Sequence, residues 1–155
     1  MKIENVEVRD IAKEFGTPVY VYSLEILRAS IVEIKKLAPV TRYAMKANSN
    51  VRILKEMLDN GVKIDAVSIF EVQRALRTGF KTDDICFTSD VFFNDGDVKF
   101  CLENNIYCNC GTLGMVEEYG KALKAMGTGS PKISIRINPG EGAGHSPSPH
   151  VDRRT

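Results

Sequence analysis

Hydrophobic positions along the chain repeat one unit, a short strand followed by a longer helix. Short apolar or β-branched runs predict strands, and the segments between them carry apolar side chains at helical spacing. The predicted strands cover residues 40–45, 62–67, 85–88, 106–110 and 133–137. They begin about 21 to 27 residues apart, a period that indicates parallel strands joined by right-handed helical crossovers.

The predicted helices begin at polar caps and end at residues that stop a helix. Asn50 caps the first helix and Gly61 ends it, Gly79 closes the second, and either Asn94 or Asp95 caps the third. The four helical segments are 51–58, 70–78, a segment that runs to residue 105, and 113–126.

Two further elements precede the repeat. Ser23 caps an amphipathic helix over residues 24–37, and the aromatic, β-branched run 19–22 predicts a strand outside the regular rhythm. Residues 138–155 are rich in Gly, Pro and Ser, which predicts a loop and a loose tail.

The repeat alone fits two architectures, an open doubly wound sheet and a (β/α)8 barrel. Five units fill an open sheet but only part of a barrel. Length alone therefore favours the open sheet.

Composition narrows the class of protein. The chain has 155 residues, 43% of them hydrophobic, with 21 basic and 20 acidic side chains, so a single domain with no broad attraction to nucleic acid or anionic membranes is expected. No apolar run reaches the roughly 18 residues that span a bilayer, and the first residues begin no secretory signal, so a cytoplasmic location is expected. Cys108 and Cys110 have neither a second cysteine pair nor a nearby histidine, so no metal site is predicted and all four cysteines are interpreted as buried, reduced thiols.

Lys46 is the most informative residue, because it stands where an apolar strand ends. The carboxyl ends of parallel strands carry the active sites of α/β folds. Packed backbone would partly desolvate a lysine there, and a neutral amine can attack a carbonyl. Position alone favours the alternative, a solvated lysine that begins a loop.

Several segments together resemble one family. The hexapeptide 43–48, Tyr-Ala-Met-Lys-Ala-Asn, resembles the Y-A-x-K-A-N signature of the fold-type III pyridoxal phosphate-dependent decarboxylases, most closely the diaminopimelate decarboxylases. Four other segments match in the same order: 15–23, 65–68 with Glu71, 75–80, and 136–139 followed by 142–145. One departure is the bulky pair Ile69-Phe70 before Glu71, which is expected to narrow the approach of the cofactor.

The resemblance implies an α/β fold, a partial (β/α)8 barrel of about five units preceded by a strand and a helix. Residues 1–23 would be a leading segment that pairs with a β domain, 24–145 the partial pyridoxal phosphate-binding barrel, and 146–155 the tail. The carboxyl-terminal β domain of the family is absent from these 155 residues.

The resemblance also implies roles for four residues. Lys46 would be the catalytic residue that holds pyridoxal phosphate covalently. Asp65 would lie near that bond, and Arg136, on a neighbouring strand, would pair with Asp65. His145 matches a position near the cofactor, without an assigned contact.

The implied activity is removal of carbon dioxide from meso-diaminopimelate to give L-lysine, with a small amino acid as substrate and a homodimer as the full-length form. The alternatives are a related decarboxylase of arginine, ornithine or carboxynorspermidine, a non-catalytic pyridoxal phosphate-binding barrel, and an unrelated flavodoxin-like binding domain. As a truncated chain, the protein is expected to be inactive and to self-associate through two open sheet edges and an apolar inner face, or to rearrange into an open sheet covered on both faces.

Overall fold

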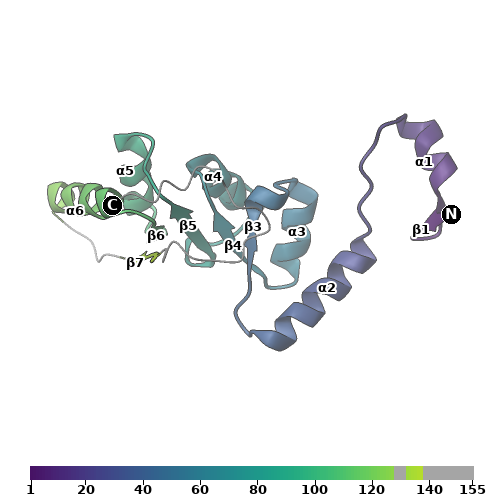
Figure 1. Ribbon diagram of the computed structural model, residues 1–155, viewed down its shortest axis with the longest axis horizontal. Coiled ribbons are helices and arrows are strands. Elements are labelled where there is room, and N and C mark those ends of the chain that lie inside the picture. Colours follow the sequence, from purple (N-terminus) through teal and green to yellow (C-terminus); the bar gives the residue numbers. More distant parts are fainter. Residues whose placement is uncertain (128–131, 138–155) are drawn as a thin grey trace.

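Five parallel strands form the central sheet of the residues that the computed structural model describes, 1–127 and 132–137 (Figure 1). The strands are β3 (Arg42–Ala44), β4 (Lys63–Ala66), β5 (Ile85–Ser89), β6 (Tyr107–Cys110) and β7 (Ile133–Ile135). Each strand pairs with the next one along the chain, so their spatial order is their sequence order.

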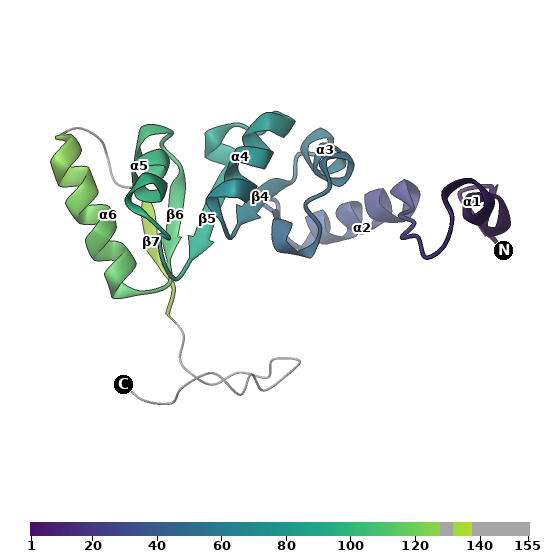
Figure 2. The ribbon, with the colours of Figure 1, turned by 90° about the horizontal axis from the view of Figure 1, so that it is seen from above.

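The helices that connect these strands are α3 (Val51–Asp59), α4 (Ile69–Thr78), α5 (Asp95–Glu103) and α6 (Leu113–Met126). Figure 2 shows them along one side of the sheet. A doubly wound sheet reverses its strand order and carries helices on both faces, whereas sequential order with helices on one side is the geometry of a barrel segment. The partial (β/α)8 barrel is confirmed, and the doubly wound architecture that length alone favours is wrong.

The helix boundaries follow the predicted caps. The Asn50 side chain accepts a hydrogen bond of 2.8 Å from the Arg52 amide at the start of α3. Gly79 ends α4 with a φ of 109°, a left-handed conformation that glycine adopts without steric cost. Asn94 occupies the cap position of α5 but makes no side-chain cap bond, and Asp97 instead accepts from the Phe93 amide at 3.0 Å.

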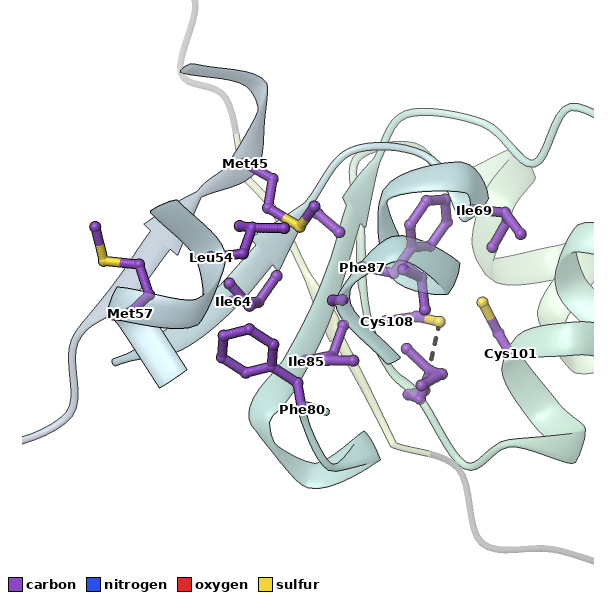
Figure 3. Close-up of a cluster of buried hydrophobic side chains, with 14 of the residues drawn as sticks. Met45, Leu54, Met57, Ile64, Ile69, Phe80, Ile85, Phe87, Cys101 and Cys108 are labelled. Atoms are coloured by element: carbon purple, nitrogen blue, oxygen red, sulfur yellow. Dashed lines mark hydrogen bonds between the residues drawn. The ribbon is translucent and has the colours of Figure 1, made fainter. Parts of the chain in front are cut away.

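The hydrophobic core lies between the sheet and these helices (Figure 3). Alternate residues of each strand point toward the helices, which is the period of two that a strand imposes. The largest side chains that are completely buried there include Met45, Leu54, Ile64, Ile85, Phe87, Ile106, Cys108 and Met115.

Helix α2 (Leu24–Leu37) packs beside α3. Ser23 caps it as predicted, accepting from the Ile26 amide at 3.2 Å, and Ile31 is buried in the core. Arg28 makes two hydrogen bonds to the buried carboxylate of Glu56 on α3, at 2.8 and 3.0 Å. Hydrogen bonding to Arg28 lowers the pKa of Glu56.

The amino-terminal residues differ most from the prediction. A short hairpin, β1 (Lys2–Ile3) with β2 (Val6–Glu7), and helix α1 (Val8–Phe15) were not indicated by the pattern, and Figure 1 shows them at the far end of the molecule from the sheet. The predicted strand at 19–22 is wrong in this structure, because its backbone joins no ladder and Tyr20 is 91% exposed. Apolar alternation gives a strand only where a partner strand takes up its hydrogen bonds.

All four cysteines are buried and free of disulfide bonds, as predicted. No helix in the described part of the chain combines the length and the hydropathy that a bilayer crossing demands.

Candidate active site

A short closed turn carries Lys46. Strand β3 ends at Ala44 and continues into the 3₁₀ turn η1 (Met45–Ala47), where Met45 is completely buried and anchors the backbone. The Tyr43 hydroxyl donates to the Asn48 carbonyl at 3.0 Å, so the first and last residues of the hexapeptide are joined. The Asn48 side chain in turn accepts from the Asn50 amide at 2.9 Å, which ties the turn to the start of α3.

Lys46 itself is exposed, so the expectation that packed backbone partly desolvates it is wrong in this structure. No ion pair involves Lys46 within residues 1–127 and 132–137. The exposure follows from the fold, since neither the turn nor the sheet face beside it is covered by a helix. The amine is therefore accessible to a reagent in solution.

The sheet face opposite the helices, here called the open face, is polar. Its residues alternate with the buried core residues of the same strands, and across the sheet they are Arg42, Lys63, Asp65, Cys86, Thr88, Tyr107, Asn109 and Ser134. The expected apolar inner face is wrong, because the apolar side chains of these strands, apart from Ala44 and Cys86, point toward the helices. The alternation signal was present in the sequence, in runs such as Lys-Ile-Asp-Ala and Tyr-Cys-Asn-Cys.

Asp65 lies on the open face of β4, one strand from Lys46. Its register partner on β3 is Ala44, two residues before Lys46, and η1 contacts β4. The Asp65 carboxylate accepts a hydrogen bond of 2.5 Å from the Thr88 hydroxyl of β5. The sequence reasoning missed Thr88. Its position two residues after Cys86, the register partner of Asp65, places it on the same sheet face as Asp65.

Cys86 stands beside this pair. Its sulfur lies 3.7 Å from the Thr88 hydroxyl, and burial raises the pKa of the Cys86 thiol. The thiol is accordingly a neutral neighbour of the Asp65–Thr88 pair at neutral pH.

Arg136 follows β7, and its amide donates to the Cys110 carbonyl at 2.8 Å. The expectation that it stands on a strand next to Asp65 is wrong, because β5 and β6 lie between β4 and β7. Three strand spacings amount to roughly 14 Å along the sheet, which exceeds the reach of a guanidinium. The Asp65 partner that the structure places is Thr88.

His145 lies outside the described residues. Of the bulky pair before Glu71, Ile69 is buried in the core and Phe70 is 82% exposed on the first turn of α4. Ser68 caps that helix by accepting from the Glu71 amide at 3.3 Å, and the Glu71 carboxylate accepts from the Val67 amide at 2.8 Å.

A second polar pair continues the row across the open face. The Ser134 hydroxyl donates to Oδ1 of Asn109 at 2.9 Å, and Asn109 is the register partner of Thr88. Among the described residues, the Asn109 amide nitrogen donates to no other side chain or backbone carbonyl, so its two N–H donors are available to another group.

These residues fit the aldehyde end of pyridoxal phosphate. An accessible primary amine at the carboxyl edge of a barrel segment can bond to the aldehyde, and a fixed carboxylate one strand away can balance positive charge there. In the described ranges, no group of three His, Cys, Asp or Glu side chains could hold a metal ion.

A parallel barrel segment with an exposed lysine at its carboxyl edge defines the class of the site, and comparison with known proteins gives the family. Residues 25–151 match the family described as "Pyridoxal-dependent decarboxylase, pyridoxal binding domain". The chain belongs to this family, as the sequence motifs predicted.

Named relatives agree with this assignment. The chain is 39% identical over 137 residues to the diaminopimelate decarboxylase of Escherichia coli strain K12, covering 86% of this chain and 31% of that protein. It is 41% identical over 139 residues to the diaminopimelate decarboxylase of Streptomyces coelicolor, covering 87% of this chain and 30% of that protein.

Among solved structures, the diaminopimelate decarboxylase from Helicobacter pylori complexed with L-lysine superimposes with a TM-score of 0.78 at 29% identity. The superposition covers 86% of this chain and 34% of that one. The chain thus spans about a third of the length of these relatives.

Proposed function

We propose that this chain binds pyridoxal phosphate covalently through Lys46 and is the cofactor-binding part of a carbon–carbon lyase that decarboxylates meso-diaminopimelate to L-lysine. The observation that carries the proposal is the exposed Lys46 amine, presented by a closed turn one strand from the Asp65 carboxylate. The substrate follows from the curated relatives, which are named diaminopimelate decarboxylases.

The bound cofactor would supply an electron-withdrawing ring, which accepts the electron pair left when carbon dioxide departs. The residues of this chain have the other tasks. Lys46 anchors the cofactor and, once released from it, can carry a proton at its Nζ atom. Asp65 provides negative charge near that nitrogen, held in place by the Thr88 hydroxyl.

Arg136 and His145 remain cofactor-binding residues in this proposal. A guanidinium at the end of β7 suits a phosphate or carboxylate group, which it can bind with two parallel hydrogen bonds. We further propose a cytoplasmic homodimer for the full-length protein.

Covalent capture of the cofactor tests the proposal. The chain is incubated with pyridoxal phosphate, reduced with borohydride and digested, and the modified lysines are located by mass spectrometry. A stable adduct on Lys46 is expected, Lys46→Arg should abolish it, and Lys124→Arg, at an exposed position on α6, should leave it unchanged. Labelling spread over surface lysines and unaffected by Lys46→Arg would contradict the proposal.

Turnover is a separate measurement on the same chain. We expect no carbon dioxide release by these 155 residues from meso-diaminopimelate, arginine or ornithine, because about two-thirds of the length of the relatives has no counterpart in them. Release from meso-diaminopimelate alone would support the substrate and disprove the inactivity. Release from arginine or ornithine alone would contradict the substrate.

A further inference from the structure

The hydrogen bond between Thr88 and Asp65 is the shortest side-chain contact on the open face. The Thr88 hydroxyl donates to Oδ1 of Asp65 at 2.5 Å, a length typical of a hydroxyl bound to a carboxylate. Bonds to charged groups are stronger than neutral ones, so this bond restricts the carboxylate more than an ordinary contact would.

The sheet fixes both partners of this bond. Asp65 is in register with Cys86 on β5, and Thr88 follows two residues later on the same face, nearer the carboxyl edge. Threonine is branched at Cβ, which restricts its χ1 rotation, and the Cys86 sulfur lies 3.7 Å from its hydroxyl. Thr88 therefore has a defined rotamer from which to hold the carboxylate.

The bond also leaves the second carboxylate oxygen of Asp65 available to another group. Thr88 occupies Oδ1, and no group in the described part of the chain donates to Oδ2 of Asp65. The turn with Lys46 lies against β4 at this same edge. A carboxylate already fixed in place stabilises a nearby positive charge without the cost of reorienting when that charge appears.

We propose that Thr88 is a positioning residue that acts through Asp65 on the reaction of Lys46 with an aldehyde. This inference rests on the proposed function and extends it to a residue that contacts neither the amine nor its reaction partner. The hydroxyl sets the orientation of the carboxylate, and the carboxylate in turn favours the cationic nitrogen that forms when Lys46 bonds to a carbonyl. In that step the lone pair of the unprotonated Nζ forms the bond to the aldehyde carbon and the C–O bond breaks. The two amine hydrogens leave with the carbonyl oxygen as water, and one proton taken from solvent makes the C=N nitrogen cationic.

The test measures how fast pyridoxal phosphate is captured at Lys46, from borohydride-trapped adduct at short times, in a set of variants. Thr88→Val removes the hydroxyl at nearly constant shape, and Thr88→Ser keeps it. Asp65→Asn and the double variant Asp65→Asn/Thr88→Val show whether Thr88 acts through Asp65. Thermal unfolding of each variant checks that the fold is retained.

We expect Thr88→Val to slow capture at Lys46 about tenfold, in keeping with the loss of a hydrogen bond to a charged group. Thr88→Ser should stay within about twofold of the parent chain, and Thr88→Val should have no further effect once Asp65 is Asn. A purely structural role would slow capture equally in both backgrounds, and that result overturns the inference.

The remaining outcomes separate the inference from the proposed function. If the parent chain is labelled at Lys46 and Thr88→Val is labelled equally fast, only the positioning role fails. If the parent chain gives no adduct at Lys46, both fail. Rescue by Ser but not by Val supports the inference, since only the hydroxyl distinguishes the two.

Discussion

At the scale of single residues, the accessibility of Lys46 comes from contacts that its neighbours make. Met45 is buried on one side of it, and the Tyr43–Asn48 hydrogen bond closes the backbone around it. The sequence motif pointed to Lys46 and to Asp65, and the structure brings these two to adjacent elements. Arg136 was misplaced because a linear pattern does not say how many strands separate two residues.

The cysteines allow a prediction at this scale. Burial raises the pKa of Cys110 to about 11, and a hydrogen bond with Cys101, followed by burial, raises that of Cys108. At pH 8 a thiol with a pKa of about 11, such as Cys110, is about 0.1% thiolate, which is the form that reacts. We expect iodoacetamide to alkylate Cys110 in the native chain roughly a hundredfold more slowly than in denaturant, as followed by mass spectrometry of the digested chain.

The denatured chain is the control for this measurement, because it should take up four equivalents, one for each cysteine. A cysteine that reacts in the native chain as fast as in denaturant would show that its burial is wrong.

At the scale of elements, the repeating units were predictable because each local signal agrees with the fold. Helix α6 occupies the predicted residues 113–126, and Ser23, Asn50 and Gly79 occupy their predicted cap positions. Hairpin β1–β2 and helix α1 were not predictable in this way. They are short, none of the residues of α1 is buried, and their attachment to α2 depends on Glu4, which accepts from the Ser23 hydroxyl and the Glu25 amide at 2.7 Å each.

The contact between α2 and α3 predicts a dependence of stability on pH. The hydrogen bond with Arg28 holds the pKa of Glu56 below its usual 4.5 in the folded chain. A group with a lowered folded pKa stabilises the fold above its unfolded pKa, and this contribution is lost as the pH falls through the folded value. We therefore expect Glu56→Gln to lower the free energy of unfolding at pH 7, and the difference from the parent chain to shrink below pH 4.5.

Denaturant unfolding at pH 7 and pH 3 measures both quantities. Glu33→Gln is the matched control, because Glu33 pairs with Lys36 on the exposed surface of α2, where an ion pair contributes little. Equal effects of the two substitutions at pH 7 would refute the role of the Arg28–Glu56 pair.

At the scale of the whole molecule, the sheet has a polar open face and two edges. Among the described residues, β3 and β7 each have a strand neighbour on one side only. An unpaired edge offers free N–H and C=O groups to another chain, whereas a polar face such as the one that carries Asp65 and Asn109 gains little from mutual burial. Self-association, as expected from the sequence, should therefore use the edges rather than the face.

Strand β7 is the edge to test, because Ile135 adds a side chain that is 55% exposed to the free backbone groups. We expect the apparent mass of the chain in size-exclusion chromatography with light scattering to rise with concentration. Ile135→Lys should reduce this rise, since a charge on an edge strand opposes pairing with a second copy.

Val32→Lys on α2 is the matched control, because Val32 is also 55% exposed but lies on a helix. If both substitutions reduce the association equally, a general change in charge accounts for the effect. A monomeric mass for the parent chain at every concentration would rule out pairing through β7.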